Sequence, residues 1–266
     1  MRFISLASGS RGNAYVLDAP EGALLIDCGL AGRTFLSRCR AAAFDPARLC
    51  GAVFTHNHAD HVQGIKALRK KFPELPLFAN ALTAEAVCAQ GCLDDPDAFC
   101  LFEDNQPFAV GPFAVTPFAV SHDVPDPVGF SIVCEGRTYF HATDAGAPLT
   151  SIGERLAGAD MATLEANHDP QLLALSARPQ CLKNRIRGPR GHLSNEEAAE
   201  LVMRFATPRL QYLHLAHLSQ ACNAAHLAFG AVSAALRARG LAAVKLAVLE
   251  QDAVFAPLPQ TLQNMI

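Results

Sequence analysis

Three histidines and an aspartate within six residues constrain this chain more than any other feature of its sequence. They form the segment HNHADH at 56–61, which ends a strand-like run and opens a helical pattern. Imidazole and carboxylate groups together are the ligands that zinc and neighbouring metals prefer. In an extended loop His56 and His58 project to one side, whereas Asp60 and His61 lie where the helix begins. Four ligands from so short a segment cannot readily surround one tetrahedral ion, so the spacing favours two metals.

Three further residues of types that bind metals lie at predicted strand ends downstream of this segment. They are His122, Asp144 and His217, which follow the apolar runs 113–120, 138–141 and 210–215. Loops at strand ends commonly carry functional residues. A carboxylate can also bridge two cations, and Asp144 is placed to do so. We therefore expect these three side chains to complete a metal centre.

Short apolar runs and helical patterns alternate along the chain. Predicted strands cover 1–6, 15–18, 23–27, 51–55, 77–79, 98–101, 108–110, 113–120, 128–133, 138–141, 160–164, 210–215 and 244–248. Predicted helices cover 31–43, 59–71, 82–90, 170–177, 195–206 and 223–239. No repeat, low-complexity tract or linker divides the chain. The pattern predicts one compact α/β domain over 1–266, with two β-rich halves that each carry helices.

Charge and composition exclude some classes of protein and leave others open. Lys and Arg number 22 against 25 Asp and Glu, a net charge of −3 that indicates neither a nucleic-acid nor a membrane partner. No apolar run reaches the roughly 18 residues that span a bilayer, and no signal-peptide pattern opens the chain. We therefore expect a soluble cytoplasmic protein without a membrane partner. The nine cysteines are scattered and without a CxxC pair, so we expect reduced thiols.

The segment 170–195 contains no acidic residue and leads into a candidate catalytic histidine. His192 precedes Ser194, which with Glu197 three positions later has the form of a capping box. N–H groups at a helix start favour phosphate, and an imidazole there could protonate a leaving group. Candidate substrate contacts are Lys183, Arg185, Arg187, Arg190 and Ser194. A solvated basic face remains the alternative reading of these charges.

The motifs together resemble those of the metallo-β-lactamase-fold hydrolases. Five of them occur in order along the chain: Asp27, the segment 56–61, His122, Asp144 and His217. The chain is more similar still to the YycJ/WalJ-like branch of that family. That similarity rests on the segments 5–13, 121–130, 142–144, 165–169, 191–195 and 217–219. The resemblance thus extends over nearly the whole chain.

The resemblance implies a four-layer αββα sandwich, a mixed α/β (α+β) fold, with a dimetal site at one edge of the paired sheets. It assigns His56, His58 and His122 to one metal, Asp60, His61 and His217 to the other, and Asp144 to both. Asp27 would orient a metal-binding histidine rather than bind metal itself. His168 would support the site or the substrate, although a histidine bonded within its own loop remains an alternative.

Three differences separate this chain from other branches of the family. Secreted β-lactamases of this fold replace the last histidine of the motif, where this chain has His61. Flavodiiron reductases carry a glutamate at the position of His58. RNA-cleaving β-CASP enzymes insert a large domain between Asp144 and His217, which are only 73 positions apart here. We therefore expect no such insertion.

The ligand pattern predicts a metal-dependent phosphodiesterase whose nucleophile is a metal-bridging hydroxide. Asp60 could also orient that hydroxide or accept its proton, and His192 could act as the acid. The resemblance implies a 5′→3′ exonuclease acting on DNA, with two divalent ions that are zinc or alternatively manganese or iron. Two alternatives stay open: a hydrolase of a small (cyclic) phosphodiester, thioester or lactone, and a metal-binding regulatory protein without turnover.

Overall fold

The computed structural model describes residues 1–257, which form two compact units. Unit 1 contains residues 1–102 and 109–113 and the described residues from 250 onward, and unit 2 contains 103–108 and 114–249. Each unit has helices packed on a β-sheet. The predicted α/β class with two β-rich halves is confirmed. No helix within residues 1–257 is both long and apolar enough to span a membrane.

The sheet of unit 1 has six strands in chain order, antiparallel from β1 to β3 and parallel from β3 to β6. The strands are β1 (Arg2–Ala7), β2 (Ala14–Ala19), β3 (Gly22–Ile26), β4 (Leu49–Val53), β5 (Leu77–Ala79) and β6 (Phe99–Leu101). The helices are α1 (Gly32–Ala41), α2 (Ala59–Val62), α3 (Ile65–Lys71) and α4 (Ala81–Ala89), with 3-10 turns at Pro46–Arg48 and Pro96–Ala98. Parallel neighbours require crossover connections, which these helices supply. The loops after β3 and β4 consequently open at the same edge of the sheet.

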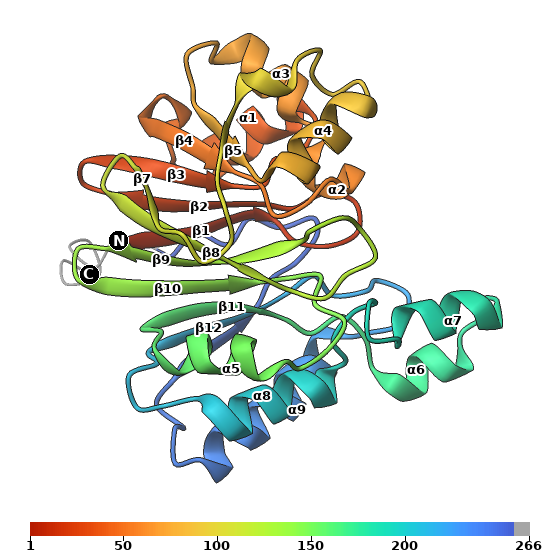
Figure 1. Ribbon diagram of the computed structural model, residues 1–266. Helices are drawn as coiled ribbons and strands as arrows, with labels where there is room; N and C mark the ends of the chain where they lie inside the picture. The colour runs from red at the N-terminus through yellow and green to blue at the C-terminus, as the bar shows by residue number, and fades with distance from the viewer. Residues whose placement is uncertain (258–266) are drawn as a thin grey trace. The chain divides into compact units, whose positions relative to one another are not determined.

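The core of unit 1 lies between this sheet and its helices (Figure 1). Leu25 of β3 and Phe54 after β4 pack in one cluster with Phe35 of α1 and Leu68 of α3. All five residues of β3 are buried, as expected for a strand that adjoins a parallel neighbour and carries a helical layer. The segments that follow β3 and β4 therefore leave from strands that are buried and packed against the helices.

The second sheet, whose strands β8 to β13 lie almost entirely in unit 2, has seven strands in the order β13-β12-β11-β10-β9-β8-β7. Strands β8 to β10 are antiparallel, whereas β10 to β13 are parallel. The strands are β7 (Phe108–Val110), β8 (Phe113–Ala119), β9 (Val128–Cys134), β10 (Arg137–Ala142), β11 (Met161–Glu165), β12 (Tyr212–Ala216) and β13 (Lys245–Val248). The helices are α5 (Thr150–Ala157), α6 (Pro170–Leu175), α7 (Gln180–Ile186), α8 (Asn195–Phe205) and α9 (Ala225–Ala238). No additional domain separates Asp144 from His217.

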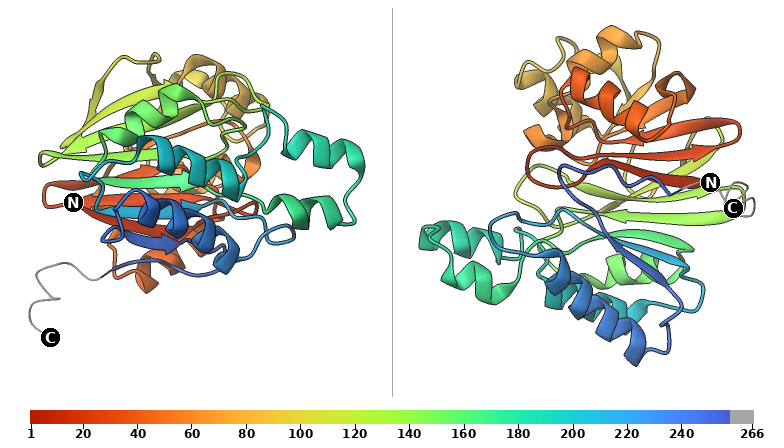
Figure 2. Two further views of the ribbon diagram at one scale, coloured as in Figure 1. Left: turned by 90° about the horizontal axis from the view of Figure 1, so that it is seen from below. Right: turned by 180° about the vertical axis from the view of Figure 1, so that it is seen from behind.

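Helices α5, α8 and α9 cover one face of this sheet (Figure 1). Phe140 of β10 and Leu164 of β11 are buried in one cluster with Ile152, Leu201 and Val232 from the three helices. The capping box predicted at Ser194 is present at the start of α8. Helices α6 and α7 instead project from this body as an arm, which Figure 2 shows from two further directions.

Two features of the helices differ from the sequence prediction. The helix predicted over 59–71 is two helices, α2 and α3, because the chain turns at Gly64. The Gly64 N–H donates to the Cys28 carbonyl at 2.8 Å, and a Cβ there would lie 2.2 Å from the Leu30 oxygen. Helices α5 and α7 were not predicted. Both are short and lack a side-chain N-cap bond, the signal by which helix starts are recognised.

His214 provides a test of how acid affects this fold. It lies buried in β12, and burial lowers its pKa from 6.5 to about 3. Below pH 6.5 the unfolded chain therefore binds a proton that the folded chain excludes, and stability falls as pH drops towards 3. In urea unfolding, His214→Leu should weaken the loss of stability between pH 6.5 and 4.5. The exposed His226→Leu is the control, and an unchanged pH dependence in His214→Leu would contradict the prediction.

Candidate metal centre

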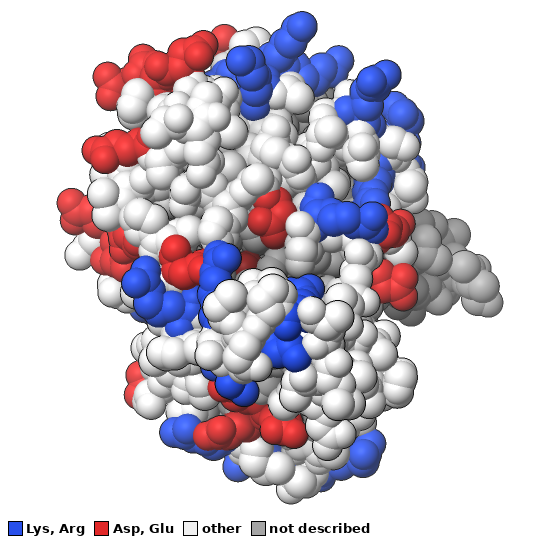
Figure 3. Space-filling model, turned by 90° about the vertical axis from the view of Figure 1, so that its right-hand side faces the viewer, with Lys and Arg blue, Asp and Glu red and all other residues white. Residues whose placement is uncertain are grey.

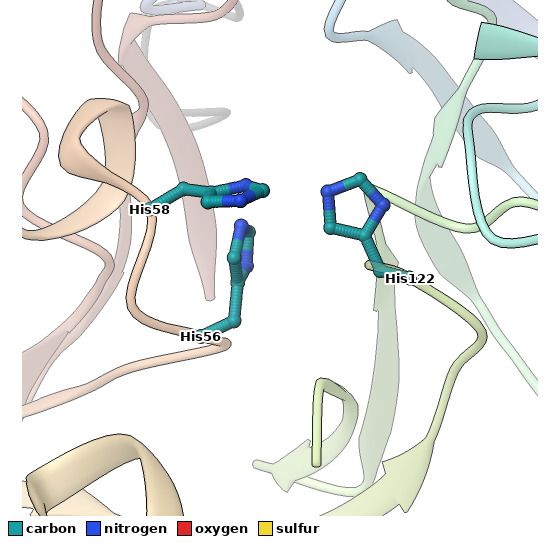
Figure 4. Close-up of side chains that lie close together, drawn as sticks. All are labelled: His56, His58 and His122. Carbon is teal, nitrogen blue, oxygen red and sulfur yellow. The ribbon is translucent and has the colours of Figure 1, made fainter. Parts of the chain in front are cut away.

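The loop between β4 and α2 gathers four metal-ligand side chains in unit 1. The His56 ring centroid lies 4.8 Å from that of His58 and 4.2 Å from that of His61. His58 is the N-cap residue of α2 with an extended backbone, and Asp60 follows in the first turn. The Asp60 carboxylate lies 3.6 Å from His61 Nε2. Figure 4 shows His56 and His58 with their rings close together above this loop.

Asp27 fixes the orientation of His61 from the end of β3. Its buried carboxylate accepts hydrogen bonds from the Thr55 N–H at 2.9 Å and from His61 Nδ1 at 2.7 Å. Because Nδ1 donates to this carboxylate, His61 Nε2 carries the lone pair. A carboxylate behind an imidazole is a common support for a metal-binding histidine. The position of Asp27 thus fits an orienting role.

Asn13, which is not among the predicted site residues, contacts His61 and Asp60. Its side-chain oxygen accepts from the Gly9 N–H at 2.8 Å and from the Tyr15 hydroxyl at 3.0 Å. These two donors fix the amide orientation, so that Asn13 Nδ2 faces His61 Nε2 at 3.0 Å and Asp60 Oδ2 at 3.3 Å. The segment 5–13 carried only turn-forming and family signals, and neither indicated this contact.

Replacing Asn13 by aspartate should lower activity about 10- to 100-fold. The change substitutes an acceptor for the donor that faces Asp60 and places two carboxylates side by side. Steady-state kinetics and metal content after dialysis measure the effect. The exposed neighbour Ser10→Ala is the matched control. Equal kinetics and metal content for Asn13→Asp and the native protein would show that the amide has no such role.

Unit 2 presents its ligand types at the ends of β8, β10 and β12. His122 follows β8, as Figure 4 shows, and its Nδ1 donates to the Gly191 carbonyl at 2.9 Å. Asp144 Oδ1 lies 3.7 Å from His122 Nε2 and 3.4 Å from His217 Nδ1. The three side chains selected at strand ends are therefore neighbours within unit 2.

Glu165, at the end of β11, joins these residues and was missed from the sequence. Its fully buried carboxylate accepts from His192 Nδ1 and His217 Nδ1, both at 2.9 Å. The Ala145 and Leu193 N–H groups donate to it as well, each at 3.0 Å. Burial raises the pKa of Glu165, but the charge of His192 and the bonds from both imidazoles outweigh it and lower the pKa to about 2. Glu165 is therefore an anion that holds two histidine rings.

The hydrogen bond to Glu165 also affects the pKa of His192. Burial favours the neutral ring, but the charge of Glu165 and the hydrogen bond to it raise the pKa of His192 above its ordinary value. The side chain is 21% exposed, so the far edge of the ring is accessible. His192 is thus suited to carry a proton and release it. The pKa of His168 shifts in the opposite direction. This residue pairs with Ser194 at the start of α8, and burial lowers the pKa of its ring.

The donor chemistry of both units fits divalent metal ions. Potential ligand atoms of Asp144, Glu165, His192 and His217 all lie within 4.8 Å of one another. Hydrogen bonds at Nδ1 of His61 and His217 leave Nε2 of each ring as the atom that could bind a metal. Asp27, Asp144 and His217 also have a left-handed backbone, with φ of 57°, 55° and 57°. Such backbone strain is concentrated at functional sites.

The predicted substrate contacts have partners of their own in unit 2. Arg185 forms an ion pair with Asp123, and Arg190 Nε donates to the His122 carbonyl at 3.1 Å. Lys183 Nζ donates to the Ala174 carbonyl at 2.6 Å. Ser194 Oγ accepts from the Glu197 N–H in the capping box, and the Glu197 carboxylate bonds the Ser194 N–H. This carboxylate disfavours phosphate at Ser194.

The chain is similar to known proteins in both sequence and fold. The model of the beta-lactamase superfamily domain matches residues 23–215. The exodeoxyribonuclease WalJ of Streptococcus pneumoniae strain D39 is 33% identical over 233 residues, 85% of each chain. The exodeoxyribonuclease YycJ of Bacillus anthracis is 31% identical over 241 residues, 90% of each chain. The metallo-β-lactamase fold protein YhfI of Bacillus subtilis is similar in structure, with a TM-score of 0.67, 19% identity and coverage of 96% of this chain and 99% of its own.

Proposed function

Because this chain belongs to the metallo-β-lactamase-fold hydrolases of the WalJ/YycJ branch, and so is a metal-dependent nuclease, we propose that it is a 5′→3′ exonuclease acting on DNA. The similarity to the exodeoxyribonucleases WalJ and YycJ carries the proposal, and the His192–Glu165 pair beside Asp144 supports it by adding a proton donor to the proposed metal ligands. We treat residues 1–266 as one functional domain, since the family match spans both units.

The proposed ligands follow the family assignment. His56, His58 and His122 would hold one divalent ion, Asp60, His61 and His217 would hold a second, and Asp144 would contribute to both. When bound, two such ions lower the pKa of an attacking water and neutralise charge on the phosphate. Zinc suits the imidazole ligands, and the carboxylates also admit manganese or iron. Asp60 has the further role of orienting the water or accepting its proton.

His192 is the proposed acid for the leaving oxygen. A departing alkoxide is poor unless it is protonated, and the raised pKa of His192 keeps a proton available. Glu165 holds Nδ1 of this ring, so the proton to be donated is on Nε2. Glu165 also carries the negative charge that stabilises the protonated ring before transfer. His168 is assigned a supporting position, since it pairs with Ser194 through backbone rather than with a ligand.

Arginines of the segment 170–195 are proposed to contact the phosphate backbone of DNA. If three phosphates are neutralised, log affinity falls with log salt at a slope near −3. Arg187→Ala should reduce that slope by about 1. Arg185→Ala should reduce it less, because Asp123 already pairs with this guanidinium. Fluorescence anisotropy with a labelled oligonucleotide at several salt concentrations measures both slopes, and an unaltered slope in Arg187→Ala would count against this contact.

A substrate panel tests the proposed function as a whole. End-labelled single- and double-stranded DNA and RNA are compared with a cyclic dinucleotide, a thioester and a lactone, each with zinc and with manganese. We expect stepwise release of nucleotides from the 5′ end of DNA. Turnover confined to a small substrate and indifferent to salt would replace the proposal with a small-molecule hydrolase, and metal binding without any turnover would indicate a regulatory protein.

A further inference from the structure

The α6–α7 arm ends in a large apolar side chain that its own unit does not cover. Leu175, the last residue of α6, is 83% exposed, more than any other large hydrophobic side chain of residues 1–257. Leu172 on the same helix is 37% exposed. Leu173 and Ile186 of the arm are buried against Cys222, which lies between β12 and α9. The exposed leucines are therefore additional to the residues that stabilise the arm.

The tip that carries Leu175 is held firmly. Ser176 Oγ donates to the Leu173 carbonyl at 2.8 Å, which closes the end of α6. Lys183 Nζ of α7 donates to the Ala174 carbonyl at 2.6 Å and so ties the two helices together. At its other end, α6 begins with the Asp169 side chain bonded to the N–H groups of Gln171 and Leu172. Side-chain hydrogen bonds at both ends of α6 thus define the position from which Leu175 is presented.

The base of the arm is bonded to the segment that carries His122. Ser121 Oγ donates to the Pro189 carbonyl at 2.6 Å, and Arg190 Nε donates to the His122 carbonyl. His122 Nδ1 in turn donates to the Gly191 carbonyl. A polymer held by the arm would therefore be fixed relative to His122 and to His192, which follows Gly191.

The charge of the arm indicates what covers Leu175. Residues 170–195 contain five Lys or Arg and no Asp or Glu. In Figure 3 basic side chains gather around the projecting lobe, with acidic side chains at intervals. A surface that combines cationic side chains with one exposed apolar side chain is complementary to a nucleic acid. The cations can contact phosphates, and the apolar side chain can contact the face of a base. Apolar side chains, leucine among them, insert between base steps in DNA-binding proteins.

We propose that Leu175 is a wedge that unstacks the end of a DNA duplex, so that a single strand enters the site. This inference rests on the proposed function and adds to it a duplex end as the substrate class. Arginines of the arm hold the phosphates while Leu175 occupies the place of the separated base. No covalent step is involved, since the wedge only lowers the cost of separating the terminal pair.

The test uses the metal-loaded full-length protein and a blunt duplex with 2-aminopurine at its terminal pair. Phosphorothioate linkages at that end prevent cleavage, and fluorescence rises when the base leaves the stack. We expect the native protein to raise the signal and Leu175→Ser to abolish the rise. The cleavable duplex should show a fall in kcat/KM of about tenfold for Leu175→Ser, with single strands little affected. Leu175→Phe should restore both properties, and Leu82→Ser, an exposed leucine on α4, is the matched control.

Other outcomes would overturn the inference. Equal losses on single strands and duplexes would show a general strand contact rather than a wedge. A change of oligomeric state in Leu175→Ser with unaltered DNA cleavage would show that a second copy covers the leucine. A native protein that cleaves single strands but leaves the terminal base stacked would refute the wedge alone. A native protein that neither binds nor cleaves DNA would refute the proposed function as well.

Discussion

Replacing His58 or Asp144 by alanine is expected to lower nuclease activity by at least about a thousandfold. His58 is the proposed ligand from unit 1, and Asp144 is the proposed carboxylate ligand from unit 2. Each is proposed to bind metal directly, so that its loss removes charge stabilisation that only the transition state requires. Activity is measured in metal-defined buffer, and the metal content of the dialysed protein is measured by mass spectrometry.

Matched histidine and aspartate controls make this result specific. His226→Ala removes an exposed imidazole from α9, and Asp45→Ala removes an aspartate that caps a 3-10 turn. Neither should alter metal content or activity. If the double variant His58→Ala, Asp144→Ala retained nuclease activity, the proposed metal mechanism would be wrong.

Replacing Glu165 by glutamine is expected to have the second-largest effect, a loss of activity of about 10- to 100-fold. The amide is nearly isosteric but neutral, so His192 loses the charge that favours its protonated form. The amide NH2 group must also face donors, because Oε1 of Glu165 accepts from both His192 and His217, and Oε2 accepts from the Ala145 and Leu193 N–H groups. The loss should appear in kcat and in metal affinity, since a proton donor and a proposed ligand are disturbed together.

The variant His192→Asn separates these two effects. It removes the proposed proton donor while Glu165 and His217 remain paired. Metal affinity should then be retained while kcat falls, and the loss should be smaller for a substrate with a good leaving group such as nitrophenolate.

If Glu165→Gln had native activity and native metal content, the carboxylate would be no more than a buried structural anion.

The segment 56–61 and the strand-end residues could be identified from sequence because each signal is local. Ligand residue types at short spacing indicate metal, and an apolar run before His122 or Asp144 places it at a strand end. Alternation of strands and helices likewise predicted the two sheets. The wrong continuous helix at 59–71 has a local cause as well: apolar periodicity continues through Gly64, while the contact that turns the chain is made by distant residues.

Glu165 and Asn13 could not be selected in the same way because their roles depend on contacts between distant residues. Glu165 meets His192 and His217 only after β11 and β12 pair in register. Asn13 resembles any turn residue until the β1–β2 connection lies against Asp60. The partners of the arginines in the arm could not be predicted from sequence either. Because Arg185 pairs with Asp123, its guanidinium is less available to a phosphate than the sequence suggested.

The left-handed backbone at Asp27, Asp144 and His217 has a consequence for laboratory evolution. Glycine adopts this conformation at the least steric cost, so glycine would relieve local strain at these three positions. Selection of a variant library for abundance alone should enrich such replacements, whereas selection for turnover should remove them. Variants selected for thermostability would consequently lose activity through substitutions at these three positions. Keeping the three residues unchanged in the library would allow the rest of the fold to be stabilised without that loss.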